Sequence, residues 1–559
     1  MARIETGDKH MASFNRREFA LAALAAGCTG AGAGGEDIIV HGGTIYTGVE
    51  SAPNAEAVRI SGGRFVVVGS LADARNGRRA REINLGSAAA YPGFTDSHTH
   101  LSGVGMSAMQ LDLVGVSSIA ELTQRLREYA AAHPEGAIIG RGWIETHWPE
   151  RRFPNCADLD SVIGDRPVFL ERIDGHAAVV NSTALGLAGI DANTRDPAGG
   201  SIERDATGAA TGMLIDNAMA LVEQQLPTPT PAMIREAIIE GARIYASRGW
   251  TGVGNMSTRL AEAQIFEDLA RRGELPLRAD IYLTMDDSGE ILESGPYGEG
   301  LVHVRGVKLY MDGALGSRGA ALLAPYNDAP SEGLLVTPVE TLRALLARAR
   351  QSGVQVATHA IGDRGNRLVL DAYRETFADD PAALRTARWR IEHAQVIAAE
   401  DIPRFAVQGV IASMQPSHAI SDLHFAPARL GPSRLAGAYA WRALLDSGAV
   451  LAAGSDAPVE RGDPLIEFYA AAHRHDLAGF AGPDWRLDQA VSRLEALRML
   501  TSSGAFASFG EAERGVIAPG MHADLSAFSV DLMSAEPSQI PSAAAVLAVS
   551  AGRITHQAV

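Results

Sequence analysis

Lysine is almost absent from this chain of 559 residues. The sequence has 49 Lys and Arg residues together, yet only Lys9 and Lys308 are lysines. Either residue supplies a solvated charge on most exposed surfaces, but only an amine can be tuned to lose its proton. Lys308 lies in an apolar run that predicts a short strand, and barrel enzymes place their chemistry at strand ends. The scarcity reflects either GC-rich codon usage or a need for a nucleophilic nitrogen, and the position of Lys308 favours the second interpretation.

The chain also has few cysteines, no excess of positive charge and no long apolar run in its body. The two cysteines, Cys28 and Cys156, give no disulfide framework, and Cys156 is interpreted as a small apolar filler. A formal net charge of −17 disfavours a nucleic-acid partner, because phosphate binding needs a dense basic surface. The body has no apolar run long enough to cross a membrane, which predicts a protein that is soluble or anchored at one end.

The N-terminal 35 residues are typical of an export signal followed by a tether. Arg16 and Arg17 precede a short apolar run at 20–26, and small residues lead into Cys28. This pattern predicts twin-arginine export and a lipid anchor on Cys28, hence a periplasmic or membrane-anchored lipoprotein. The alternative is a basic terminus without function and a cytoplasmic protein. Met11 is the alternative start, since residues 1–10 lie oddly upstream of the signal.

The rest of the chain predicts two folded parts. Alternating β-branched residues broken by glycine pairs at 36–92, and similar runs at 510–559, predict one small β-domain built from both ends of the chain. Between them, residues 93–509 alternate short apolar strands with amphipathic helices, the pattern of βα repeats. Residues of about 103–165 are long for one connection and predict an inserted helical lobe.

Four of the predicted strands close on side chains that bind metals. These ends carry His98 and His100, His359, His393, and Asp456, with Lys308 between them in the sequence. In His98-x-His100 the two imidazoles share one face of a strand and converge, as a zinc-like cation requires. Each end alone is better explained as a polar residue that begins a loop, but the ordered set is not.

Together with these ends, several short motifs resemble the amidohydrolase superfamily. More narrowly, the chain is similar to YtcJ-like metal-dependent hydrolases, which include N-substituted formamide deformylases. The resemblance runs from about residue 37 to the C-terminus. It rests on residues 142–143, 152–154, 159–160, 174–177, 312–318, 359–363, 392–394, 415–418 and 454–459.

The resemblance implies an α/β fold, a (β/α)8 TIM barrel with a small β-sandwich domain, and a metal site at the carboxyl ends of the strands. It implies two divalent ions, with zinc the expected metal, and a carboxylated Lys308 that bridges them from the fourth strand. The other implied ligands are His98 and His100 for one ion, His359 and His393 for the second, and Asp456 on the eighth strand. The sequence predicts nine strands for eight places in the barrel, and one of those ending near Glu171, Asn255 and Thr284 must lie outside it. The nine end near His100, Glu171, Asn255, Thr284, Lys308, His359, His393, Met414 and Asp456.

Further roles follow from the predicted chemistry. Asp456 would move protons, and His176 and Arg318 are candidates for stabilising the oxyanion. Supportive packing and a structural salt bridge are the alternatives for these last two residues. Trp143 and His418 are expected to line the substrate pocket.

The predicted enzyme is a hydrolase of carbon–nitrogen bonds other than peptide bonds. A metal-activated hydroxide would attack an amide-type bond in an N-acyl amine, an N-formyl amine or a cyclic amide. The alternatives are a deaminase or an ester or lactone hydrolase using the same site, and a non-catalytic metal- or ligand-binding lipoprotein. The expected partners are a small-molecule substrate and the membrane, the latter through Cys28 alone. A homo-oligomer is one option, and the sequence does not fix the oligomeric state.

Overall fold

The computed structural model describes residues 36–559 except 78, 147, 174, 176, 198 and 484. The predicted export signal with Cys28 and the predicted catalytic residue His176 lie outside the described residues and stay predictions. Within the described ranges, no helix combines the length and the apolar character needed to cross a membrane.

Eight parallel strands form a nearly closed barrel, which confirms the predicted fold class. In chain order they are β6 (Phe94–Thr99), β13 (Trp250–Thr258), β14 (Arg278–Leu283), β16 (Val302–Tyr310), β17 (Gln355–Ala360), β18 (Arg390–His393), β19 (Ile411–Met414) and β20 (Leu451–Ala453). The surplus candidate is the strand that ends near Glu171, because β9 (Val168–Arg172) belongs to another sheet. Lys308 therefore lies on the fourth barrel strand, and His359 and His393 lie on the fifth and sixth.

The barrel closes between β20 and β6 through a glycine. The backbone N–H of Asp456 donates to the carbonyl of His98 at 2.7 Å, which joins the last strand's exit to the first strand. A Cβ atom at Gly454 would lie 2.4 Å from the backbone nitrogen of His98 and 2.8 Å from an oxygen of Asp96. Any larger residue at Gly454 would push these segments apart.

Helices cover the outside of the barrel and begin at clear sequence signals. Thr230 caps α7 (Pro231–Ser247), with Pro231 in the first turn, and Ser492 and Glu495 form a capping box on α18 (Arg493–Leu500). The other helices of at least seven residues that follow the barrel strands are α2 (Leu101–Met109), α8 (Leu260–Arg271), α10 (Val339–Gln351), α11 (Asp363–Thr376), α12 (Pro381–Ala387), α13 (Ile402–Gln408), α15 (Ala426–Leu435) and α17 (Pro464–His473).

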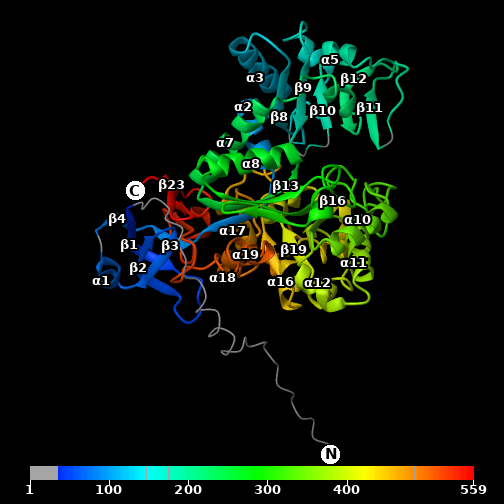
Figure 1. Cartoon of the computed structure of the whole chain (residues 1–559). Helices are drawn as coiled ribbons and strands as arrows, with labels where there is room; N and C mark the ends of the chain where they lie inside the picture. The colour runs from blue at the N-terminus through cyan, green and yellow to red at the C-terminus, as the bar shows by residue number, and fades with distance from the viewer. Residues whose placement is uncertain are drawn as a thin grey trace, which may run out of the picture.

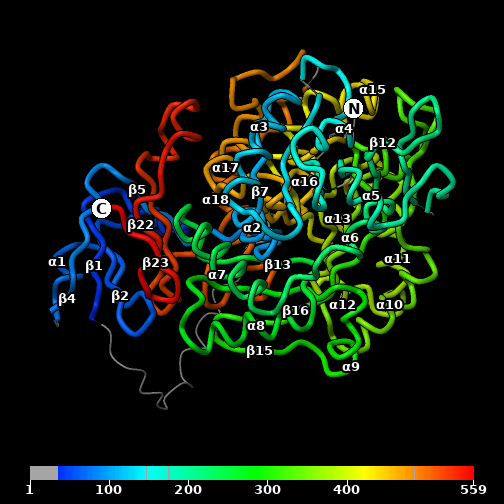
Figure 2. The backbone as a smooth tube through the Cα atoms, turned by 90° about the horizontal axis from the view of Figure 1, so that it is seen from above, coloured from blue at the N-terminus to red at the C-terminus, as the bar shows by residue number. Residues whose placement is uncertain are grey.

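Both ends of the described chain build one eight-stranded sheet. Figure 2 shows these segments, in blue and red, lying together beside the barrel. The strands of the sheet are β1 (Asp37–Tyr46), β2 (Asn54–Ser61), β3 (Arg64–Gly69), β4 (Ala80–Asn84), β5 (Ala89–Pro92), β21 (Leu525–Phe528), β22 (Ala545–Ser550) and β23 (Arg553–Gln557). On one edge of β1, β4 pairs with the first half and β5 pairs at Ile45 in the second half, so the sheet branches there. Apolar side chains from both ends then share one core, which includes Val40 and Leu547.

A lobe inserted between β6 and β13 has its own six-stranded sheet and lies above the barrel in Figure 1. It consists of β7 (Leu111–Asp112), β8 (Ile138–Trp143), β9, β10 (Ala177–Val180), β11 (Gly200–Arg204) and β12 (Ala210–Asp216), with α3 (Ile119–Ala132), α4 (Cys156–Asp160) and α5 (Ser182–Leu187). The range of about 103–165 therefore covers only part of this insertion, which carries strands as well as helices. The sequence alone leaves the strand that ends near Glu171 among the barrel candidates, because a buried strand has the same apolar pattern in either sheet.

Candidate metal centre

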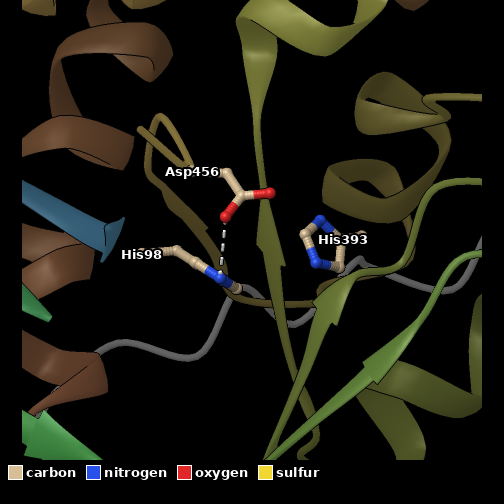
Figure 3. Close-up of side chains that lie close together, drawn as sticks. All are labelled: His98, His393 and Asp456. Carbon is tan, nitrogen blue, oxygen red and sulfur yellow. Dashed lines mark ion pairs between the residues drawn. The ribbon is translucent and has the colours of Figure 1, made fainter. Parts of the chain in front are cut away.

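Side chains from five barrel strands converge at the carboxyl ends of those strands. His98 lies on β6 with His100 one residue beyond it, Lys308 on β16, His359 on β17 and His393 on β18. Asp456 follows β20 by three residues. Figure 3 shows His98, His393 and Asp456 pointing toward one another.

Short distances join His98 to its neighbours. Its Nε2 atom lies 3.1 Å from Nζ of Lys308 and 3.3 Å from Oδ1 of Asp456. The same carboxylate oxygen lies 3.1 Å from Nε2 of His100. One donor atom each from His98, His393 and Asp456 lie within 4.8 Å of one another, and all three residues are buried.

The imidazoles of His359 and His393 extend this cluster. Their ring centroids are 4.5 Å apart, and the ring of His393 lies 5.0 Å from that of His98. His393 Nδ1 lies 2.8 Å from Oε1 of Gln415, which leaves its other nitrogen for a ligand. The structure thus brings together all six residues that the resemblance implies as ligands.

The protonation states of the cluster suit a cation. Burial alone would raise the pKa of Asp456, but its interactions with His98 and His100 hold it well below its usual range. Burial lowers the pKa of His393, and the neighbouring His359 lowers it further; burial also lowers the pKa of His100. A charged carboxylate and neutral imidazoles are the forms that bind metals. The donor set therefore fits a divalent ion such as zinc, which nitrogen and oxygen ligands hold in proteins.

Beneath the cluster, a buried ion pair orients His98. Glu392 Oε2 lies 2.6 Å from Nδ1 of His98, and Arg390 donates to both carboxylate oxygens of Glu392 at 2.5 and 3.0 Å. Arg390 also donates to the carbonyl of Ser97 and the hydroxyl of Ser413. Burial would raise the pKa of Glu392, but the Arg390 charge holds it well below its usual range. A charged acceptor at Nδ1 fixes the tautomer of His98, so that the lone pair of Nε2 faces Lys308 and Asp456.

The backbone around the ligands is strained. His393, Ala394 and Asp456 have φ values of 71°, 42° and 58°, in the left-handed region that non-glycine residues rarely adopt. Asp96 stabilises one of these turns, since its carboxylate accepts from the backbone N–H groups of His98 and Ser455 at 3.1 and 2.9 Å. Such strain persists where the surrounding structure over-determines it, and it concentrates at functional sites.

Comparisons with known proteins agree with this geometry. The amidohydrolase family model matches residues 81–556. The putative amidohydrolase YtcJ of Bacillus subtilis is 36% identical over 519 residues, which cover 90% of this chain and 96% of that protein. The chain belongs to the amidohydrolase family.

Two further similar proteins carry hydrolase names. The N-substituted formamide deformylase of Arthrobacter pascens is 28% identical and covers 84% of this chain and 89% of its own length. The crystal structure of an uncharacterized metal-dependent hydrolase from Pyrococcus horikoshii superposes with a TM-score of 0.75 at 28% identity, over 90% of this chain and 99% of that one. The protein is therefore a metal-dependent hydrolase.

The other predicted site residues have different surroundings. Arg318 forms an ion pair with Asp328 at 2.9 Å, and its side chain is 38% exposed. The indole N–H of Trp143 donates to the carbonyl of Leu170, and the ring packs on Trp148 inside the lobe. The catalytic and substrate-binding roles of these two residues stay predictions.

His418 lies directly beside the cluster. Its ring stacks on His393 with centroids 5.8 Å apart, and its Nε2 atom lies 3.8 Å from Oδ2 of Asp456. Among the residues that the structure describes, this nitrogen is buried and has no hydrogen-bond partner. A buried polar atom of this kind usually meets a water molecule, an ion or a ligand.

Sequence reasoning missed the residues that support the ligands. Arg390 and Glu392 are two charges at alternate positions of a short apolar strand, so both side chains point into the barrel. That alternation was a usable signal, because charges rarely enter a barrel interior unless they are paired. The contact of Glu392 with His98 depends on the barrel geometry and has no counterpart in the sequence.

Proposed function

We propose that this amidohydrolase cleaves an amide-type carbon–nitrogen bond in an N-acyl amine, an N-formyl amine or a cyclic amide. The proposal includes two divalent ions, with zinc the expected metal, bridged by carboxylated Lys308. The observation that carries it is the position of Lys308, the one lysine of the folded body. Its amine is buried beside Nε2 of His98, within the group of predicted ligands.

A carbamate explains why arginine does not occupy this position. The ammonium first loses one proton; the lone pair of the neutral amine then adds to carbon dioxide and a second proton is released. A cationic side chain thereby becomes an anionic carbamate with two oxygens. A guanidinium is charged at every physiological pH and offers no such lone pair. Bridging two cations needs an anionic ligand, which the carbamate would supply.

The side chains around the metals would bind and move protons. A bound divalent ion lowers the pKa of water toward 7 and polarises a carbonyl group. Asp456, held as a carboxylate, can accept the proton of that water and pass it to the leaving nitrogen. Nε2 of His100 lies 3.1 Å from Oδ1 of Asp456, and its Nδ1 contacts the carbonyl of Met256. Because both ring nitrogens are held, His100 restricts how the Asp456 carboxylate turns. His418 offers a ring nitrogen on the other side of Asp456, where a substrate carbonyl or leaving group would meet it.

The test is a comparison of Lys308→Arg with Lys308→Ala on a panel of substrates. The panel holds N-formyl and N-acyl amines, with hydantoins and lactones as controls. We expect Lys308→Arg to abolish hydrolysis although it keeps the charge, and Lys308→Ala to recover part of its activity with added short carboxylic acids. Full activity in Lys308→Arg would falsify the carbamate, and preference for lactones would overturn the amide bond.

A further inference from the structure

Tyr310 is the second residue after Lys308 and lies beside the cluster. Alternate residues of a strand share a face, so Tyr310 points to the same side of β16 as Lys308. Its ring centroid lies 4.9 Å from Nζ of Lys308 and 5.4 Å from the ring centroid of His359. The residue is nevertheless 37% exposed, whereas Lys308 and His359 are buried. An aromatic surface thus remains open directly beside two predicted ligands.

The phenol group of Tyr310 is held in place by Ser257. The two hydroxyl oxygens are 2.5 Å apart, and Ser257 has a φ of 54°, a strained conformation for a residue other than glycine. The carbonyl oxygen of the preceding residue, Met256, lies 3.1 Å from Nδ1 of His100. The same end of β13 therefore positions both a predicted ligand and the ring of Tyr310. Because the hydroxyl is engaged with Ser257, the ring is what Tyr310 presents to a substrate.

The two flanks of the cluster differ in chemistry. Ring contacts run from Tyr310 to His359, from His359 to His393 and from His393 to His418. At the His418 end, a ring nitrogen and the Asp456 carboxylate form a polar flank. At the Tyr310 end, the flank is an aromatic face. A substrate with one polar and one planar apolar side would fit in a single orientation.

We propose that Tyr310 is a substrate-contacting residue that binds a planar, apolar acyl substituent. The leaving nitrogen would lie at the Asp456 flank, where it can receive a proton, and the acyl side would lie against the ring of Tyr310. The proposal rests on the proposed function and narrows it, since an aroyl group would be preferred to a formyl or acetyl group. Stacked aromatic pairs contribute enough for a preference of roughly threefold to tenfold.

The first experiment measures binding and needs no turnover. Benzoate and acetate, the carboxylate products of benzoyl and acetyl amides, are titrated into the metal-loaded protein by calorimetry. We expect benzoate to bind at least threefold more tightly than acetate. Tyr310→Ala should remove this ratio, and Tyr310→Phe, which keeps the ring, should preserve it. Equal binding of the two anions by the wild-type protein, or an unchanged ratio in Tyr310→Ala, would overturn the proposal.

The second experiment measures hydrolysis of N-benzoyl and N-acetyl derivatives of one amine. We expect Tyr310→Ala to raise KM for the benzoyl substrate alone, with kcat little changed, and Tyr310→Phe to match the wild type. A large loss of kcat for both substrates in Tyr310→Phe would make the hydroxyl the acting group and overturn the proposal. If the benzoate ratio depends on the ring but neither amide is hydrolysed, the amide reaction fails and the role of Tyr310 stands.

Discussion

The floor and the rim of the metal site are built in opposite ways. The floor consists of His98, Glu392 and Arg390, which are fully buried and joined by hydrogen bonds of 2.5 to 3.0 Å. The rim consists of Tyr310, which is partly exposed to solvent, and His418, whose Nε2 atom has no hydrogen-bond partner among the described residues. Paired charges in the floor fix the positions of the metal ligands, whereas groups of the rim that are left without partners can bind different substrates. The difference suggests that metal binding depends on the floor and substrate choice on the rim.

Removing the charge of Glu392 from the floor should give the largest effect, a loss of metal affinity. We expect Glu392→Gln to weaken metal binding by about tenfold to a hundredfold, because His98 loses a charged acceptor and Arg390 loses its counter-ion. Competition with a chelator of known affinity measures this change. Asp280→Asn is the matched control, since Asp280 is also a buried carboxylate held by arginines on a barrel strand but touches no predicted ligand. A Glu392→Gln protein with wild-type metal affinity would refute the role of the floor.

Asp280 itself should affect stability and not metal binding. Burial would raise its pKa, but Arg514 and Arg305 lower it from 3.8 to about 2. A lowered pKa in the folded state stabilises the protein above pH 4, and this contribution is lost as the pH falls from about 4 to 2. Asp280→Asn should therefore cost about 2 kcal/mol at pH 7. Urea unfolding at pH 7, 4 and 3 would show the difference from wild type shrinking, and a difference independent of pH would contradict the assignment.

The smallest effect on stability and activity is expected at the exposed ion pair of Arg318 with Asp328. The ion pair of Arg318 with Asp328 leads us to expect that Arg318→Ala and Asp328→Ala each cost at most about 1 kcal/mol of stability. Both variants should keep kcat within a few fold. A hundredfold loss of kcat in Arg318→Ala alone would instead support the oxyanion role predicted from the sequence. Steady-state kinetics and thermal unfolding of Arg318→Ala and Asp328→Ala distinguish the two roles.

Much of the fold could be predicted from the sequence, because strand ends carry their own signals. Apolar runs end at or near His98-x-His100, Lys308, His393 and Gly454, which lies two residues before Asp456. Barrel topology requires the carboxyl ends of these strands to meet at one end of the barrel. From the sequence, the strands of the inserted sheet could not be told from those of the barrel, since β9 has a buried apolar pattern like that of a barrel strand. Strand pairing across more than a hundred residues decides that question, and no local pattern reports it.

The supporting contacts were beyond the sequence for a similar reason. Glu392 meets His98 across 294 positions, and Tyr310 meets Ser257 across 53. The pattern showed that such residues point inward, but it could not show which side chains they touch. Arg318 illustrates the converse case, because its partner Asp328 is only ten residues away and a structural salt bridge was one of the alternatives.

The metal content of the purified protein tests the central claim most directly. Elemental analysis of protein produced with zinc and bicarbonate should give two divalent ions per chain for the wild type. It should give fewer for Lys308→Arg, because the bridging ligand is then missing. Protein that remains folded but binds no divalent ion after careful loading would contradict the account.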